Sequence, residues 1–132
     1  MKIHHHDLEI ELDDTWWEEV GMKNFAPKTI AYRVNIKAAN GLEIFKVRID
    51  EVSPVRRNPG VGIFNDNNVA TAKDRVESIL NGFLTGSVIP PVEVVPEPKG
   101  SNYRYKLVHG AHRFYCSLAA GFSHVPAIEV LI

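Results

Sequence analysis

Alternation of apolar and polar residues predicts strands toward both ends of the chain. Residues 8–12 read Leu-Glu-Ile-Glu-Leu, which is the two-residue period of a half-buried strand. The same kind of evidence predicts strands over residues 91–95, 103–108 and 126–132, the first two joined by a Pro/Gly-rich turn at 96–102. We therefore expect a β-sheet built mainly from the second half of the chain.

A further alternating segment predicts a β-hairpin before residue 50. Four apolar side chains fall on one face of an extended segment: Ile30, Tyr32, Val34 and Ile36. Asn40-Gly41 then supplies a tight turn, and residues 44–49 form a second apolar-rich run. These features predict two antiparallel strands joined at Asn40-Gly41.

Helical periodicity appears in two later segments. Thr71 to Asp74 has the pattern of a capping box, and an apolar stripe follows it as far as Gly86: Ala72, Val76, Ile79, Leu80, Phe83 and Leu84. A second helix is predicted over 111–120, where Gly121 and Phe122 fit the C-terminal Schellman motif. The acidic segment 13–20 is compatible with one or two further helical turns.

The resulting order of elements predicts a mixed α/β chain of the α+β class. Residues 53–70 contain prolines, glycines and an Asn-rich run, and we expect them to form a long loop. A length of 132 residues with 45% apolar content suits one compact domain. We divide it into an N-terminal strand and hairpin extension, 1–48, packed on a main domain, 49–132.

Composition limits the classes of function. The chain has 15 Lys and Arg against 16 Asp and Glu, so no general basic field favours nucleic acid. The single cysteine, Cys116, cannot form an internal disulfide, and no apolar run is long enough for a membrane span. The N-terminus also lacks the order of a signal peptide. We expect a cytoplasmic protein with no membrane association.

Residues 110–113 form the strongest candidate binding site. Gly110 lies where a predicted strand meets a helix, and the first-turn amides of such a helix favour anions. His112 and Arg113 lie at the same positive end, where a cation costs roughly 0.3–1 kcal/mol unless a negative charge offsets it. We interpret Gly110, Ala111, His112 and Arg113 as a phosphate site. The alternative is an ordinary turn glycine beside a solvated arginine.

The preceding helix offers a second set of candidates. Arg75, Ser78 and Gly82 are spaced by three and four residues, so they share one stripe beside the apolar face. Side chains on such a border can line a cleft. Considered alone, however, an exposed arginine and a neutral serine explain the same pattern.

Four segments together resemble the ParB/sulfiredoxin superfamily over about residues 49–132. They are Ile49–Pro59, Val88–Val94, His109–Phe114 and Val125–Val130, in that order. The resemblance implies a small mixed sheet with two main helices and a cleft for ATP, ADP or CTP. In that cleft the glycine turn and the basic pair hold phosphates, and the preceding helix adds contacts.

The resemblance is closer at some site positions than at others. His112 and Arg113 match the phosphate-binding His-Arg pair of sulfiredoxins. Arg75 and Ser78 fall where those proteins keep a lysine and a serine, whereas Gly82 replaces the usual threonine.

Two departures restrict the expected chemistry. Ala111 occupies the position of the sulfiredoxin cysteine, and Cys116 lies inside the predicted helix, where a packing role is expected. ParB partition proteins carry an acidic residue in this turn and append a helix-turn-helix region, for which this chain has no room. Sulfiredoxin and partition activities are both disfavoured.

Some relatives are phosphotransferases or nucleases, and these chemistries need carboxylates to bind Mg²⁺ or accept a proton. Asp66, Asp74 and Glu77 are the candidates, with Asp66 in the long loop as the catalytic choice. Arg57, in the same loop, can reach a ligand phosphate, although a solvated arginine is an equal alternative. Whether the protein is an enzyme stays open at this point.

Two clusters stand outside this site. The histidines at 4–6 lack a partner ligand, so we predict a disordered end rather than a metal site. Trp16-Trp17 suggests either a protein-binding patch or a lid over the sheet.

The leading hypothesis is a nucleotide- or phosphate-binding domain, with phosphoryl transfer or nucleotide hydrolysis as its chemistry if it is catalytic. The alternatives are a non-catalytic protein-interaction module that keeps the fold, and a ParB-like nuclease or DNA-binding protein, which the charge disfavours.

Overall fold

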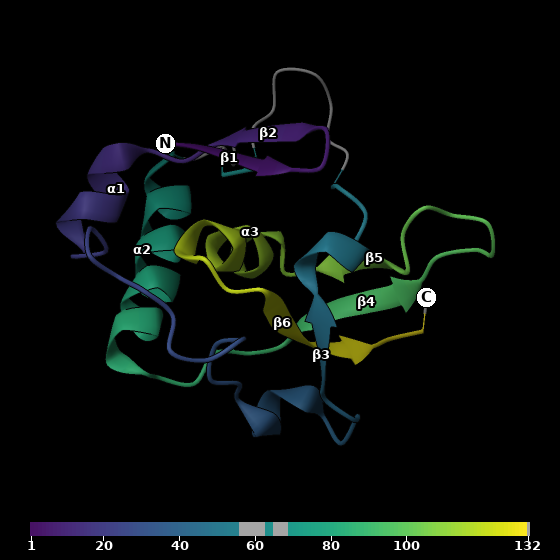
Figure 1. Ribbon diagram of the computed structural model, residues 1–132. Helices are drawn as coiled ribbons and strands as arrows, with labels where there is room; N and C mark the ends of the chain where they lie inside the picture. Colours follow the sequence, from purple (N-terminus) through teal and green to yellow (C-terminus); the bar gives the residue numbers. More distant parts are fainter. Residues whose placement is uncertain (56–62, 65–68, 132) are drawn as a thin grey trace.

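The computed structural model describes residues 1–55, 63–64 and 69–131, and they form an α+β fold. A four-stranded sheet has the order β3-β6-β4-β5. Its strands are β3 (Phe45–Arg48), β6 (His124–Glu129), β4 (Val92–Pro96) and β5 (Tyr105–His109) (Figure 1). The central pair, β6 and β4, is parallel, and both outer pairs are antiparallel. The α+β class predicted from sequence is confirmed.

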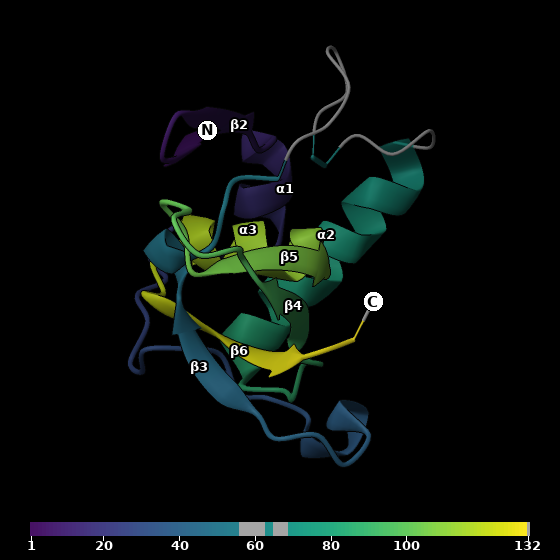
Figure 2. The same ribbon diagram turned by 90° about the vertical axis from the view of Figure 1, so that its right-hand side faces the viewer.

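Helix α3 (Ala111–Ala120) lies at the centre of the molecule. It packs against β4 and β6 of the sheet, against the long helix α2 (Val69–Thr85), and against strand β1 (Lys2–His5). Figures 1 and 2 show β1 and its partner β2 (Leu8–Glu11) on the side of α3 away from the sheet. Enclosure on several sides explains why Phe114, Tyr115, Cys116 and Ser117 are buried.

The N-terminal residues belong to the same hydrophobic core as the rest of the chain. Ile3, Ile10, Leu12 and Trp16 join the cluster that contains Phe114 and the buried residues of the sheet. The short helix α1 (Asp14–Glu19) packs against α2, and Lys73 on α2 pairs with Glu19 at 3.1 Å between Nζ and Oε2. Strand β3, which precedes residue 49, is also an integral strand of the main sheet.

The hairpin predicted over residues 30–49 is wrong. Residues 30–36 form no strand: Val34 makes one isolated bridge with Ile89, whose amide and carbonyl bond to Arg33 and Asn35. A 3-10 helix, η1 (Ile36–Ala39), comes next, and β3 pairs with β6. Two backbone groups of the first segment thus bond to the α2–β4 connection, and Ile30 O accepts from the amide of His124. Both Asn40 and Gly41 do adopt positive φ, but this turn joins no strand pair.

The histidine-rich N-terminus is ordered, contrary to the sequence prediction. His4 and His5 lie in β1, which pairs with β2 in a hairpin, and His6 occupies the turn with a φ of 56°. His5 is only 3% exposed. Its side chain finds partners in distant segments, which local sequence reasoning could not reveal.

Trp16 is buried in the core, on a helix that packs against α2 rather than as a lid laid over the sheet. Burial also removes Trp16 from any protein-binding patch, whereas Trp17 keeps partial exposure. Of the two residues in the predicted protein-binding patch, Trp17 alone is exposed enough to contact a partner.

Of the two helix ends predicted from sequence, the start of α2 is wrong and the end of α3 is confirmed. Helix α2 begins at Val69, so Thr71 lies within it and the capping box at Thr71 is wrong. At the end of α3, the amide of Gly121 donates to Leu118 O and the amide of Phe122 to Ser117 O, each at 3.1 Å. These two bonds, with Gly121 at φ 95°, confirm the Schellman motif.

Within the described residues, no helix combines the length and apolar character that crossing a bilayer requires.

Candidate functional site

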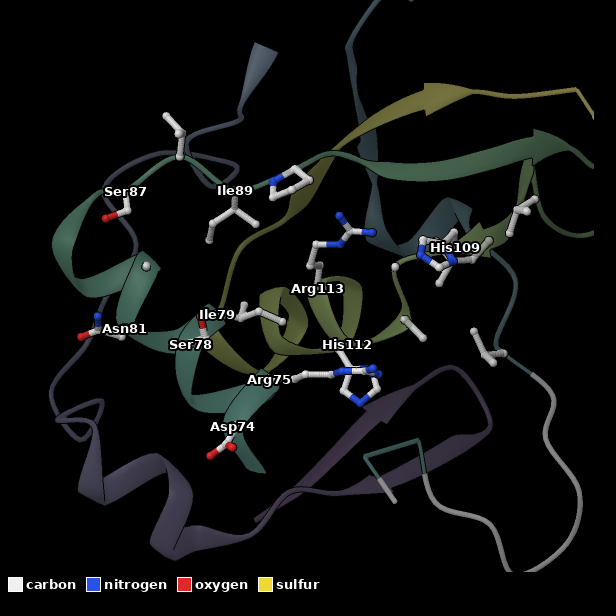
Figure 3. A pocket seen from close by; sticks show the side chains of 18 residues that line it. Asp74, Arg75, Ser78, Ile79, Asn81, Ser87, Ile89, His109, His112 and Arg113 are labelled. Carbon is white, nitrogen blue, oxygen red and sulfur yellow. The ribbon is translucent and has the colours of Figure 1, made fainter. Parts of the chain in front are cut away.

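A cavity of about 1040 Å³ opens where the start of α3 faces α2 and the segment leading into β4. Helix α2 contributes Asp74, Arg75, Ser78, Ile79, Asn81 and Gly82, and the segment before β4 contributes Ser87 to Pro90. The end of β5 and the first turn of α3 supply the remaining wall, from Leu107 to Arg113, and Val55 completes it (Figure 3). Segments far apart in the sequence thus share one hollow.

The structure brings together every predicted ligand-binding residue that it describes. Six of them line the cavity: Gly110, Ala111, His112, Arg113, Arg75 and Ser78. Figure 3 shows Arg75 and Ser78 on α2, with Arg75 extending toward His112 on α3. Two further candidates, Asp66 and Arg57, lie outside the described residues.

Gly110 makes the strand-to-helix turn possible. Its φ of 102° and ψ of 31° lie in the left-handed region, which glycine enters without steric cost. Its carbonyl accepts the Phe114 amide at 2.9 Å, which starts the helix. An α-helix holds no acceptors for its first-turn amides, and Gly110 has no side chain to provide one. Helix starts of this kind favour anions in proteins generally.

The guanidinium of Arg113 folds back over this turn. A Cβ on Gly110 would lie 2.9 Å from Nη2 and 3.2 Å from Nε of Arg113, and 3.0 Å from Cγ1 of Val92. Glycine thus permits the close approach as well as the dihedral angle. The half-buried Arg113 holds its planar donor fork at the wall of the cavity.

The described residues provide little negative charge to balance Arg113. Among the described residues, no carboxylate comes within 4.0 Å of its guanidinium. Buried Tyr32 is close enough for the Arg113 charge to favour its phenolate, but burial dominates and raises the pKa of Tyr32. The Tyr32 hydroxyl instead donates to Pro90 O at 2.6 Å, so it stays neutral and does not offset the cation.

His112 presents its ring to the aromatic side chain of Phe64, with centroids 5.7 Å apart and an interplanar angle of 61°. The Nε2 atom of His112 is buried, and the residue as a whole is half-buried. His109, at the end of β5, also lines the cavity and is exposed. Two imidazoles and two arginines therefore border this hollow, against the single acidic residue Asp74 on its described wall.

Apolar side chains form the rest of the wall. Ile79 and Ile89 face the hollow together with Val88 and Val108, which are 46% and 41% exposed. At Gly82 a Cβ would lie 2.9 Å from Cδ1 of Ile89, so α2 approaches Ile89 closely. The cavity can accept a ligand that has both an anionic and an apolar part.

The carboxylate candidates separate in the structure. Asp74 is exposed and lines the cavity, whereas Glu77 does not line it and faces Lys73 at 3.7 Å. No group of three or more His, Cys, Asp or Glu side chains in the described part of the chain is arranged to hold a metal ion. Two of the three carboxylates named from sequence, Asp74 and Glu77, are described, and of these two Asp74 lies where it can contact a ligand in the cavity.

Cys116 has the packing role expected from sequence. Its side chain is fully buried in α3, and burial raises the pKa of the thiol. A protonated, enclosed thiol is a poor nucleophile.

Sequence reasoning missed Tyr32, Asn81, Ser87 and His109. Tyr32 was placed on a strand, and its contact with Pro90 depends on tertiary structure that no local pattern reports. His109 directly precedes the glycine turn, and this adjacency was a signal that could have identified it.

Comparisons with known proteins returned no match: no family model, curated sequence or solved structure matched this chain. Membership of the ParB/sulfiredoxin superfamily therefore stays a prediction that depends on the sequence motifs.

Proposed function

We propose that this protein binds a phosphate-bearing ligand, a nucleotide in the leading case, in the cavity beside Gly110. One observation carries the proposal: Arg113 lies over a glycine turn at a helix start, on a cavity wall, with no described carboxylate within ion-pair distance. A cation in this position is unfavourable toward the helix dipole. An anion in the cavity offsets that cost and meets the first-turn amides at the same time.

The surrounding residues suit phosphate oxygens. Arg113 offers a planar fork for two of them, and charge-assisted hydrogen bonds of this kind are stronger than neutral ones. Arg75, the Ser78 hydroxyl and His112 line the same hollow and can contact further oxygens. A ligand with more than one phosphate group would contact residues of both α2 and α3.

The apolar wall favours a nucleotide over free phosphate. Ile79, Ile89 and Val88 offer a surface for a base or sugar, and the cavity volume of about 1040 Å³ is at the upper end of common ligand sites. The superfamily resemblance independently suggests ATP, ADP or CTP. Mg²⁺ would accompany such a ligand, bound largely through its phosphates.

Phosphoryl transfer or nucleotide hydrolysis is the reaction class proposed if the site is catalytic. Asp74 is the described carboxylate on the cavity wall, and the Asp66 hypothesis lies outside the described residues. Cytoplasmic location remains part of the same proposal.

Calorimetric titration with ATP, ADP, CTP and inorganic phosphate tests the binding proposal. We expect Arg113→Ala to weaken binding at least tenfold. Arg104→Ala is the matched control, because Arg104 is exposed and lies away from the cavity, near Glu51. No binding by the wild type, or equal binding by wild type and Arg113→Ala, would contradict the proposal.

Ala111 supports one alternative, a non-catalytic interaction module that keeps the fold, since it replaces the reactive cysteine of sulfiredoxins. The protein partner would contact Trp17, because Trp16 is buried. A Trp17→Ala variant that loses such a partner while retaining nucleotide binding separates the two functions. DNA binding stays disfavoured by the formal charge of −1, and a gel-shift series across salt concentrations tests it.

A further inference from the structure

His5 connects the N-terminal hairpin to helix α3 and to the segment that enters the cavity wall. Its Nε2 lies 3.1 Å from Ile49 O, and its Nδ1 lies 2.9 Å from the hydroxyl oxygen of Tyr115. The same hydroxyl accepts the amide of Val55 at 3.0 Å. Three segments far apart in the sequence therefore meet at one imidazole and one phenol.

The chemistry of the partners determines the form of His5. A carbonyl oxygen only accepts, so Nε2 carries the proton and donates to Ile49 O. Nδ1 is then the acceptor, and Tyr115 donates its hydroxyl proton to it. This arrangement leaves a lone pair of the phenol oxygen for the Val55 amide. The network as observed thus contains a neutral His5.

A second proton on His5 changes the hydrogen bonds of this network. Protonation turns Nδ1 into a donor, so Tyr115 can no longer donate to it and the phenol must reverse its role. The phenol oxygen must then accept from Nδ1 as well as from the Val55 amide, which weakens the Val55 bond. Because Val55 lines the cavity, a change in its hydrogen bond to Tyr115 alters the cavity wall.

The surroundings of His5 disfavour its cation in the folded protein. Burial is the largest effect and lowers the pKa of His5, and the neighbouring His6 on the hairpin acts in the same direction. Asp50, on the short 3-10 helix η2 (Ile49–Glu51), acts in the opposite direction, as do backbone carbonyls. From α3 the rings facing His5 are those of Phe114 and Tyr115, with centroids 5.2 and 5.4 Å away. No acidic side chain in the described part of the chain pairs with His5.

We propose that His5 is a pH-sensitive latch that holds the Val55 wall of the cavity at neutral pH and releases it on acidification. Its effect on ligand affinity rests on the proposed phosphate site, whereas its effect on Val55 does not. Because His109 and His112 also line the cavity, variants of His5 are needed to isolate its own effect.

Amide hydrogen exchange at Val55, followed by NMR at pH 7.5 and 5.5 and corrected for intrinsic exchange, tests the latch. In the wild type we expect protection of Val55 to fall at least fivefold on acidification. His5→Gln, which cannot titrate, should abolish this pH dependence. His4→Gln is the matched control, because His4 lies exposed on the same strand, and it should behave as the wild type.

Tyr115→Phe provides a second test should His5→Gln fold poorly. It removes the acceptor of the Val55 amide and leaves His5, which titrates in the tested range, in place, so Val55 should be weakly protected at both pH values. Unchanged Val55 protection in the wild type, or pH dependence that persists in His5→Gln, overturns the latch.

Titration of the same proteins with inorganic phosphate gives the ligand readout. Between pH 7.5 and 5.5, the affinity of the wild type for phosphate should fall more, or rise less, than the affinity of His5→Gln. Absence of phosphate and ATP binding by the wild type at pH 7.5 overturns the proposed function alone, because Val55 exchange still decides the latch.

Discussion

Arg113 lies so close to Gly110 that a single methyl group on the glycine would collide with its guanidinium, with Nη2 only 2.9 Å from the position of the added carbon. The two residues form one unit. The glycine gives the backbone a left-handed conformation, and its missing side chain leaves room for the guanidinium. A phosphate in the cavity can therefore meet the amides and the guanidinium together.

Substitution of Gly110 by alanine should destabilise the fold and weaken phosphate binding. The φ of 102° costs an alanine about 1–3 kcal/mol, and the added carbon must also displace Arg113 or Val92. Gly100→Ala is the control, because Gly100 has a φ of 90° with no atom within 4 Å of the added carbon. Urea denaturation should show the larger loss for Gly110→Ala. Equal losses would mean that the Arg113 contact contributes nothing.

Tyr32→Phe should cost about 0.5–1.5 kcal/mol of stability, the usual range for one hydrogen bond. The substitution removes the donor to Pro90 O, which lies at 2.6 Å on the cavity border. Tyr105→Phe is the comparison: its hydroxyl makes no hydrogen bond within the described residues, and its loss should be smaller. Thermal unfolding measures both. A Tyr32→Phe protein as stable as the wild type would show that this bond does not hold residues 30–36 against Pro90.

Stability should decrease on acidification through His5. Burial lowers the pKa of His5 in the folded state, so the unfolded chain takes up its proton first, at about pH 6.5. The contribution of His5 to the free energy of unfolding is complete above that pH and is lost as the pH falls below it. Urea midpoints at pH 7.5, 6.5 and 5.5 should fall less steeply in His5→Gln than in the wild type. The same slope in both proteins would assign the acid sensitivity to other groups.

Cys116 should be inert to alkylation in the native protein. Its side chain is fully buried, and burial raises the pKa of the thiol, so the reactive thiolate is absent near neutral pH. Mass spectrometry after iodoacetamide treatment should detect no adduct in buffer and complete labelling in concentrated urea. Rapid labelling in buffer would show that α3 opens readily.

The elements with local signals were predictable from sequence. Helix α3 begins at Ala111 and ends at Ala120 as predicted, because Gly110 and Gly121 adopt the left-handed conformations that start and end it. Strands β4 and β5 also follow their apolar patterns closely. The candidate residues Gly110 and Arg113 could be named for the same reason, since a strand-turn-helix signal is contained within a few consecutive positions.

Only the tertiary structure decided which distant segments meet. Residues 30–36 have the sequence pattern of a strand, yet the backbone of Arg33 and Asn35 bonds to Ile89. Strand β3 pairs with β6 and not with residues 30–36. His5 looked like part of a disordered end, but it finds its partners more than forty residues away in Ile49 and Tyr115. Hydrogen bonds of helices and turns join near neighbours and leave a local signature, whereas strand pairing and buried polar contacts depend on the packing of the whole chain.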